Sequence, residues 1–358
     1  MKKVLLFTDS LGAGGAQRQL VGLSLLLKQK NYGVKVCTYH KLEFYKYFLD
    51  ENSIPNEIIP SASNPFKRIF AVIKYFNRED PDWIIAFQEM PSLISCLAKI
   101  FCRSSHLIVS ERNTTQSIGI KDYIRFFLYK YADYIVPNSY TQSSFLKNKF
   151  VWMIPKIRTI TNFVDTEKFY PKKHVKHSIT HIVVVGSLWP SKNPRGLVKA
   201  CRLLKDLGVN VHICWYGLND DVTDYHKETV NLLESLNVSD YLEFLPKTKQ
   251  ILEKYQNADF LCLPSLFEGT PNVICEALAC GIPIICSDVC DNNLYVTEDY
   301  NGFLFDPLDP NSIAKSVIKA VSMSEQKYGE FCVRCRKVAE EKLSKESFVL
   351  KYEQILKR

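Results

Sequence analysis

The sequence alternates short apolar runs with amphipathic stretches, and this pattern occurs twice along the chain. In the first half the apolar runs are residues 3–9, 34–39, 83–87, 106–110 and 134–139. Continuous apolar strands between helices are typical of a parallel sheet, because helices bury both of its faces. The first half therefore predicts a doubly wound α/β domain.

A polar, basic, proline-containing stretch at residues 170–180 interrupts the alternation and reads as a linker. The pattern then resumes with apolar runs at 181–187, 211–217 and 259–265. We expect two Rossmann-like doubly wound domains, residues 1–170 and 171–358, that face each other across a cleft. The last helix is expected either to stay in the second domain or to pack back on the first. Ligands of such sheets bind beyond the carboxyl ends of the strands.

Composition narrows the class of protein. No run approaches the roughly 20 apolar residues of a membrane span. The first ten residues fit a strand better than a signal peptide, because the apolar run is short and Asp9 follows it. The twelve cysteines are scattered, and the single C-x-x-C, Cys332 and Cys335, has no second pair at zinc spacing. We therefore expect a cytoplasmic protein with reduced, mostly buried thiols.

The net charge of +8 is concentrated in the first half, where residues 1–170 carry 23 Lys and Arg against 14 Asp and Glu. Residues 66–78 and 122–134 interleave aromatic and basic side chains. Two interpretations stay open: helices with an apolar core stripe and a solvated basic face, or helices that lie on an anionic membrane surface. Nucleic acid is not expected as a partner, because no recognised binding motif accompanies the charge.

Two loops between a strand and a helix are candidate anion sites. Gly12, Gly14 and Gly15 precede a helix that includes Gln17, and they allow close backbone approach to a phosphate or merely a tight turn. The loop with Ser187 and Lys192 follows the apolar run 181–187. Its lysine is either a point charge for a diphosphate or an ordinary surface lysine.

The most informative segment is SLFEGTPNVICEALACGIPII, residues 265–285, in which Glu268 and Glu276 lie eight positions apart. Thr270 and Pro271 predict a helix start, with threonine as N-cap and proline at the first helical position. Such a start offers backbone N–H groups to an anion. Glu276 lies in an apolar helix, where a carboxylate requires polar partners such as ribose hydroxyls.

The glycine loop, the SLWPSKN loop and above all this segment resemble the retaining, nucleotide-sugar-dependent glycosyltransferases of family 4, which have the GT-B fold. Residues 160–169, ITNFVDTEKF, are similar to another motif of that family. The resemblance covers essentially the whole chain. It implies transfer of a hexose or N-acetylhexosamine from a nucleotide sugar, UDP-linked by preference, without a metal or other cofactor. The implied acceptor is a glycan or a polyprenyl-diphosphate-linked glycan of bacterial polysaccharide or glycolipid synthesis.

The resemblance also implies roles for individual residues. Glu276 would bind the ribose, and Glu268 would contact the transferred sugar. Lys192 would neutralise the leaving diphosphate, with Gly15 assisting from the other domain. The remaining donor-side candidates are Gly14, Ser187, Gly269, Thr270, Pro271, Asn272 and Val273, and the acceptor-side candidates are Gln17, Glu111, Arg112 and Asn113.

Two positions depart from the family pattern. Ser187 stands where many members have an arginine beside the lysine, and Arg112 stands where many have a histidine. Arg112 is therefore a catalytic candidate that either supplies the missing cation or forms a structural ion pair with Glu111 or a neighbour. Two further hypotheses stay open: a sugar-nucleotide epimerase of the same fold, and a non-catalytic nucleotide-sugar-binding protein.

Overall fold

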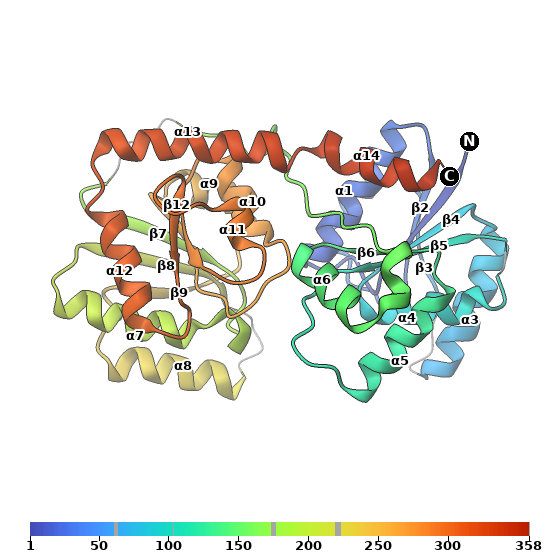
Figure 1. Ribbon diagram of the computed structural model, residues 1–358, viewed down its shortest axis with the longest axis horizontal. Helices are drawn as coiled ribbons and strands as arrows, with labels where there is room; N and C mark the ends of the chain where they lie inside the picture. The colour runs from blue at the N-terminus through green and yellow to red at the C-terminus, as the bar shows by residue number, and fades with distance from the viewer. Residues whose placement is uncertain (61–63, 103, 173–176, 219–222, 358) are drawn as a thin grey trace. The chain divides into compact units, whose positions relative to one another are not determined.

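The structure is a computed structural model that describes residues 1–357 apart from 61–63, 103, 173–176 and 219–222. The chain forms two compact units, residues 1–162 with 345–358 and residues 163–344. Each unit contains a parallel six-stranded sheet with helices packed on it (Figure 1). The predicted doubly wound α/β class is thus confirmed. Part of the predicted linker, residues 173–176, lies outside the described residues.

The sheet of the first unit has the strand order β3-β2-β1-β4-β5-β6. Its strands are β1 Lys3–Phe7, β2 Gly33–Thr38, β3 Asn56–Ile58, β4 Trp83–Phe87, β5 His106–Glu111 and β6 Tyr134–Pro137. Its helices are α1 Gly15–Gln29, α2 Lys46–Glu51, α3 Pro65–Glu79, α4 Glu89–Lys99, α5 Ile120–Leu128, η1 Tyr129–Tyr131, α6 Tyr140–Lys149, η2 Val151–Lys156 and, from the end of the chain, α14 Lys345–Leu356. The order reverses between β1 and β4, so polar residues that follow these strands meet at one edge of the sheet.

The sheet of the second unit has the order β12-β11-β10-β7-β8-β9, which makes β9 an edge strand. Its strands are β7 Thr180–Val185, β8 Val211–Leu218, β9 Leu242–Pro246, β10 Phe260–Leu263, β11 Ile284–Ser287 and β12 Gly302–Phe305. Its helices are η3 Pro190–Lys192, α7 Pro194–Asp206, α8 Asp224–Ser235, α9 Ile251–Gln256, α10 Asn272–Ala279, α11 Asn292–Tyr295, α12 Pro310–Val321 and α13 Glu325–Lys342. Separate apolar cores fill its two faces, one around Trp215 and the other around Leu261 and Ile274.

The boundaries of the units differ from the predicted division after residue 170. Residues 163–170 pack with the second unit, because Phe169 is buried in its core and the Val164 N–H donates to the Leu343 carbonyl. The last helix, α14, belongs to the first unit and lies beside α1 (Figure 1). Tyr352 is fully buried there, and Lys2 Nζ donates to the Leu356 carbonyl at 2.7 Å.

The twelve cysteines are all free, and nine of them are buried. None of the described helices combines the length and the apolar content that crossing a bilayer requires.

The packing of α14 leads to a test of its contribution to stability. Tyr352→Ala removes a fully buried ring and should lower the free energy of unfolding by about 3–5 kcal/mol, as large-to-small core substitutions do. Leu350→Ala, at a position 48% exposed on the same helix, should change it little. Urea unfolding of the two variants measures the difference, and equal effects would contradict the inferred packing of α14.

Candidate active site

Two loops at the carboxyl edge of the second sheet bring a cation and a carboxylate together. Lys192 ends η3, after β7, and Glu268 follows β10, the neighbouring strand. Lys192 Nζ forms an ion pair with Glu268 Oε1, and the Ser265 hydroxyl donates to the same oxygen at 2.7 Å. The Leu266 N–H donates to the Ser191 carbonyl at 2.8 Å, which joins the loops through their backbones.

The loop that carries Lys192 is fixed by an unusually close backbone approach. A Cβ atom on Gly217 would lie 1.9 Å from the Gly186 carbonyl oxygen, so this position accepts only glycine. The indole of Trp215 donates to the same oxygen at 2.6 Å. Ser187 is half-buried in this loop, and its carbonyl accepts from the Trp189 N–H. The direction of the Lys192 side chain therefore depends on β8 as much as on its own loop.

Helix α10 begins one residue later than the sequence predicts. Its first helical residue is Asn272, and Pro271 occupies the N-cap position with an extended backbone, so Thr270 is not the N-cap. The reason is that the Pro271 carbonyl accepts the first helical hydrogen bonds, from Ile274 and Cys275. Thr270 is buried and its hydroxyl lies 3.5 Å from the Tyr295 hydroxyl instead.

The first residues of α10 continue the arrangement around Glu268. Gly269, Asn272 and Val273 are half-exposed, so the backbone at this helix start is accessible. Glu276, one turn further on, is only 3% exposed, and the Tyr255 hydroxyl of α9 donates to its Oε2 at 2.9 Å. The structure thus brings Ser187, Lys192, Glu268 and Glu276 to one edge of one sheet. Tyr255 and Ser265 were missed by the sequence analysis, because nothing in their local sequence marks them as partners of the two acids.

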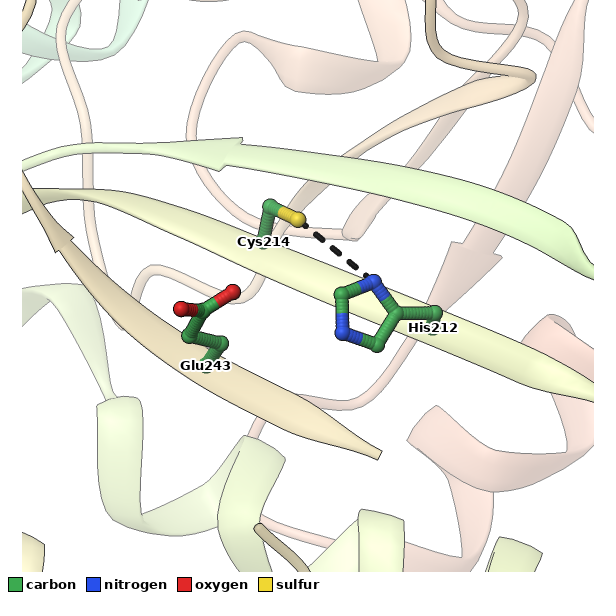
Figure 2. Close-up of side chains that lie close together, drawn as sticks. All are labelled: His212, Cys214 and Glu243. Atoms are coloured by element: carbon green, nitrogen blue, oxygen red, sulfur yellow. Dashed lines mark hydrogen bonds between the residues drawn. The ribbon is translucent and has the colours of Figure 1, made fainter. Parts of the chain in front are cut away.

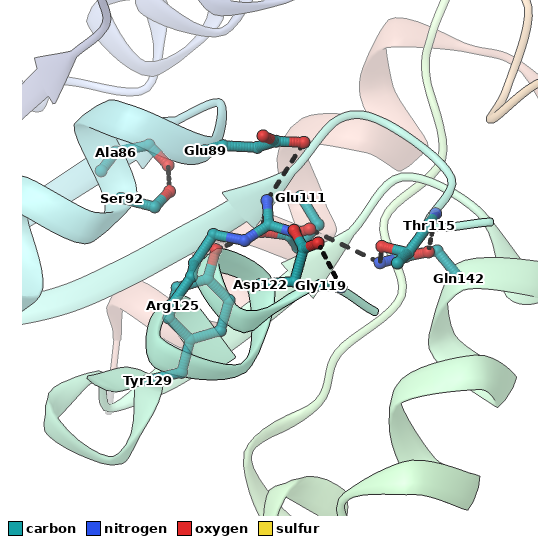
Figure 3. A network of polar contacts seen from close by, with 10 residues as sticks. All are labelled: Ala86, Glu89, Ser92, Glu111, Thr115, Gly119, Asp122, Arg125, Tyr129 and Gln142. Carbon is teal, nitrogen blue, oxygen red and sulfur yellow. Dashed lines mark hydrogen bonds and ion pairs between the residues drawn. The ribbon is translucent and has the colours of Figure 1, made fainter. Parts of the chain in front are cut away.

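In the first unit Glu111 lies in a buried polar network at the end of β5. Its carboxylate accepts from Tyr129, from Arg125 at 3.5 Å and from Gln142 at 3.5 Å, as Figure 3 shows. Arg125 also pairs with Glu89 and Asp122, both at 3.2 Å. Burial raises the pKa of Glu111, while Arg125 and the hydrogen bond from Tyr129 oppose that rise. These contacts give Glu111 a structural task, and its role at the acceptor side stays a prediction.

Arg112, the next residue, is buried without such compensation. Its guanidinium donates to Asn162 at 2.6 Å and to Ser110 at 3.4 Å, and it lies 4.6 Å from the centroid of the Phe87 ring. Among the described residues no carboxylate pairs with it, so the expected ion pair with Glu111 is not formed: Arg125 occupies that place. Burial lowers the pKa of Arg112 to about 10, so it remains a cation at neutral pH. Asn113 is exposed beside it.

The glycine loop lies at the carboxyl edge of the same sheet, after β1. Gly14 is the N-cap of α1 and Gly15 its first residue. A Cβ on Gly14 would meet the Gln17 side-chain oxygen at 2.1 Å, and Gln17 Nε2 donates to Asp9 at 3.0 Å. The Gln17 amide therefore covers Gly14.

Gln88 is a further candidate at this edge that the sequence analysis did not single out. It follows β4, and its backbone has a φ of 75°, which is rare for a residue other than glycine. The Thr8 hydroxyl donates to its side-chain oxygen at 2.8 Å. Strained backbone of this kind is concentrated at functional sites, so Gln88 joins Arg112 as a candidate side chain of the first unit.

Both sheets have polar residues at their carboxyl edges, and one edge carries a Lys–Glu pair beside a helix start, an arrangement that suits a ligand with an anionic group. Comparison with known proteins identifies the class of protein. The model "Glycosyltransferase Family 4" matches residues 13–168, and the model "Glycosyl transferases group 1" matches residues 165–342. The chain belongs to this glycosyltransferase family, with the GT-B architecture, and is an enzyme.

Two relatives and one solved structure illustrate the similarity. The chain is 26% identical to N-acetylgalactosamine-N,N'-diacetylbacillosaminyl-diphospho-undecaprenol 4-alpha-N-acetylgalactosaminyltransferase of Campylobacter jejuni, over 80% of this chain and 81% of that protein. It is 32% identical to UDP-Gal:alpha-D-GlcNAc-diphosphoundecaprenol alpha-1,3-galactosyltransferase of Escherichia coli, over 46% and 45% of the two chains. The structure of Anabaena HepE in complex with UDP-glucose superposes with a TM-score of 0.86 at 17% identity and covers 100% of both chains.

The burial of Glu276 leads to a prediction about donor binding. Glu276→Ala removes the carboxylate from the helix interior and leaves the Tyr255 hydroxyl without its acceptor, so affinity for a nucleotide sugar should fall severely. Calorimetric titration with UDP-sugars measures this affinity. Glu253→Ala, an exposed carboxylate on α9, is the matched control and should bind normally. Unchanged affinity in Glu276→Ala would remove its role at the ribose.

Proposed function

We propose that this protein is a retaining glycosyltransferase that moves a hexose or N-acetylhexosamine from a UDP-sugar to a polyprenyl-diphosphate-linked glycan, in the synthesis of a bacterial surface polysaccharide. The observation that carries the proposal is the Lys192–Glu268 pair at the edge of the sheet beside the start of α10. The names of the relatives support it, since both act on diphospho-undecaprenol-linked acceptors and one uses UDP-Gal. The structural similarity to a UDP-glucose complex fits the same donor class.

In this proposal the ion pair between Lys192 and Glu268 breaks when the nucleotide sugar binds. The diphosphate takes over Lys192 and the N–H groups at the start of α10, and Glu268 is released to accept hydrogen bonds from the sugar hydroxyls. As the sugar–phosphate bond breaks, negative charge grows on the departing phosphate, where Lys192 and the helix start stabilise it. Glu276 holds the ribose, and the acceptor hydroxyl attacks from the face that the phosphate leaves. No metal or other cofactor takes part.

Arg112 has a separate task in the proposal. Arg112 is a buried guanidinium with no carboxylate partner in the described part of the chain, which costs free energy in the unliganded protein, and an anion beside it offsets that cost. The substrates supply such an anion, because both the donor and the lipid-linked acceptor carry a diphosphate. Arg112 thereby replaces the cation that Ser187 does not provide.

The function is tested with a panel of labelled UDP- and GDP-sugars, each with and without a polyprenyl-diphosphate glycan. We expect release of nucleoside diphosphate only when acceptor is present, with an α-anomeric product by NMR from an α-linked donor. Lys192→Ala should lower turnover by about 10²-fold, as for one preorganised electrostatic group, while exposed Lys199→Ala should not. Isomerised donor without release would support the epimerase instead, and binding without reaction would support a binding protein.

A surface of the first unit suits peripheral attachment to the inner face of the cytoplasmic membrane. On α5, Ile120 is 83% exposed, and Tyr123, Ile124 and Phe127 are exposed beside it. Val151 and Trp152 of η2 are also exposed, and Tyr123 contacts Phe150 at the start of that element. We define these six exposed side chains as the α5/η2 surface. Exposed lysines, Lys121, Lys130, Lys147 and Lys149, surround it and complement anionic lipid head groups.

This attachment gives a prediction for vesicle binding. The double substitution Ile124→Asp and Phe127→Asp puts two charges into the α5/η2 surface and should reduce sedimentation with vesicles that contain phosphatidylglycerol. Val333→Asp, at a position 70% exposed in the second unit, should bind like the wild type. Equal sedimentation of both variants would contradict membrane contact through α5.

A further inference from the structure

Three potential metal ligands lie together on β8 and β9, apart from the candidate active site. His212 and Cys214 are two residues apart on β8, so their side chains point to the same face of the sheet. Glu243 of β9 is the register partner of Cys214. One ligand atom from each of the three residues lies within 4.8 Å of the others. Figure 2 shows the three side chains converging on one face of the two strands.

This cluster lies apart from the loops of the candidate active site. His212 pairs in register with His181, near the beginning of β7, whereas the loop with Lys192 follows the end of that strand. The opposite face of β8 is filled by Val211, Ile213 and Trp215, which belong to the apolar core. The cluster is more open: His212 and Cys214 are half-buried and Glu243 is exposed, so an ion can enter from solvent.

The distances fit zinc. Zinc bonds of about 2.3 Å to sulfur and about 2.0–2.1 Å to nitrogen, at a tetrahedral angle, separate the two ligand atoms by about 3.5–3.6 Å. Cys214 Sγ lies 3.6 Å from His212 Nδ1. The two side chains therefore have the spacing of bound ligands without rearrangement, and the Glu243 carboxylate needs only a side-chain rotation at an exposed position.

The donor set also selects the kind of ion. One thiolate, one imidazole and one carboxylate suit a borderline-soft divalent cation, whereas magnesium and calcium require oxygen ligands. Zinc would neutralise the two negative charges of Cys214 and Glu243, and water would complete a tetrahedron. The Cys214 thiol gives up its proton to solvent when the ion binds.

We propose that His212, Cys214 and Glu243 bind a zinc ion that ties the edge strand β9 to β8. Edge strands have one side of their backbone unpaired, and a bond from β9 to its neighbour opposes fraying of β9. The site lies apart from the candidate active site, and the proposed transfer reaction does not use it. It would make the stability of the second unit depend on zinc.

Cobalt absorption tests the site, because a thiolate bound to Co²⁺ gives an intense charge-transfer band and tetrahedral Co²⁺ gives strong visible bands. Full-length protein without a histidine tag is stripped with a chelator and titrated with Co²⁺, and the ion is then displaced with Zn²⁺. We expect both sets of bands at one equivalent of Co²⁺ and their loss when Zn²⁺ is added. A wild-type protein without the charge-transfer band would overturn the proposal.

Matched variants assign the ligands. Cys214→Ser should abolish the charge-transfer band, whereas Cys332→Ser, which removes the half-buried thiol of the C-x-x-C pair, should retain it. Glu243→Gln changes an exposed side chain with little risk to folding, and it should weaken Zn²⁺ affinity by at least about tenfold in competition with a chromophoric chelator. Zn²⁺ should also raise the thermal midpoint of the wild type, raise that of Glu243→Gln less, and leave that of Cys214→Ser unchanged. A band that persists in Cys214→Ser, or an unchanged affinity in Glu243→Gln, would show that the ion binds elsewhere.

Discussion

The close approach of Gly217 to the Gly186 carbonyl is the constraint on which the candidate active site depends. It lets β8 lie against the loop after β7, and the Trp215 indole then fixes that carbonyl with a hydrogen bond. Lys192 leaves the fixed loop and reaches Glu268 beyond the neighbouring strand β10. Both members of the pair are partly exposed, so its contribution to stability is small. Its importance lies in position: it holds a cation and a carboxylate beside a helix start.

Glu111 and Arg112 are consecutive buried charged residues of the first unit, but their hydrogen-bond partners differ in charge. Glu111 is buried with three hydrogen-bond donors around it, one of them the cation Arg125, and this network supports the fold. Arg112 is buried with neutral partners and no described carboxylate. Removing one partner of a compensated buried charge destabilises the fold, whereas an uncompensated buried charge favours binding of a counterion. Neighbouring residues of one motif thus meet different electrostatic conditions, and the proposed task of Arg112 rests on the second of them.

Much of the fold follows from the sequence pattern, and the misses have physical causes. The apolar runs located most strands because both faces of a parallel sheet are buried, but β3 has only three half-buried residues and gives no such signal. The N-cap of α10 was placed one residue early because Thr270 followed by Pro271 matches a common capping pattern. In the structure the first helical hydrogen bonds go to the Pro271 carbonyl, so Pro271 is the N-cap. The compact units divide after residue 162 rather than after the predicted residue 170, because Phe169, just before the polar linker, is held in the core of the second unit.

The sequence by itself determined the two doubly wound domains, through the periodicity of their apolar runs, and the family, through its motifs, and it singled out Lys192, Glu268 and Glu276 as candidates. Only the tertiary structure decided their partners. Tyr255 and Ser265 meet the two acids through packing, and Arg125 rather than Arg112 pairs with Glu111. The same holds for His212, Cys214 and Glu243, whose spacing matches no linear metal motif. Parallel strand pairing brings together residues that are far apart in the chain, and local sequence patterns do not indicate which residues pair.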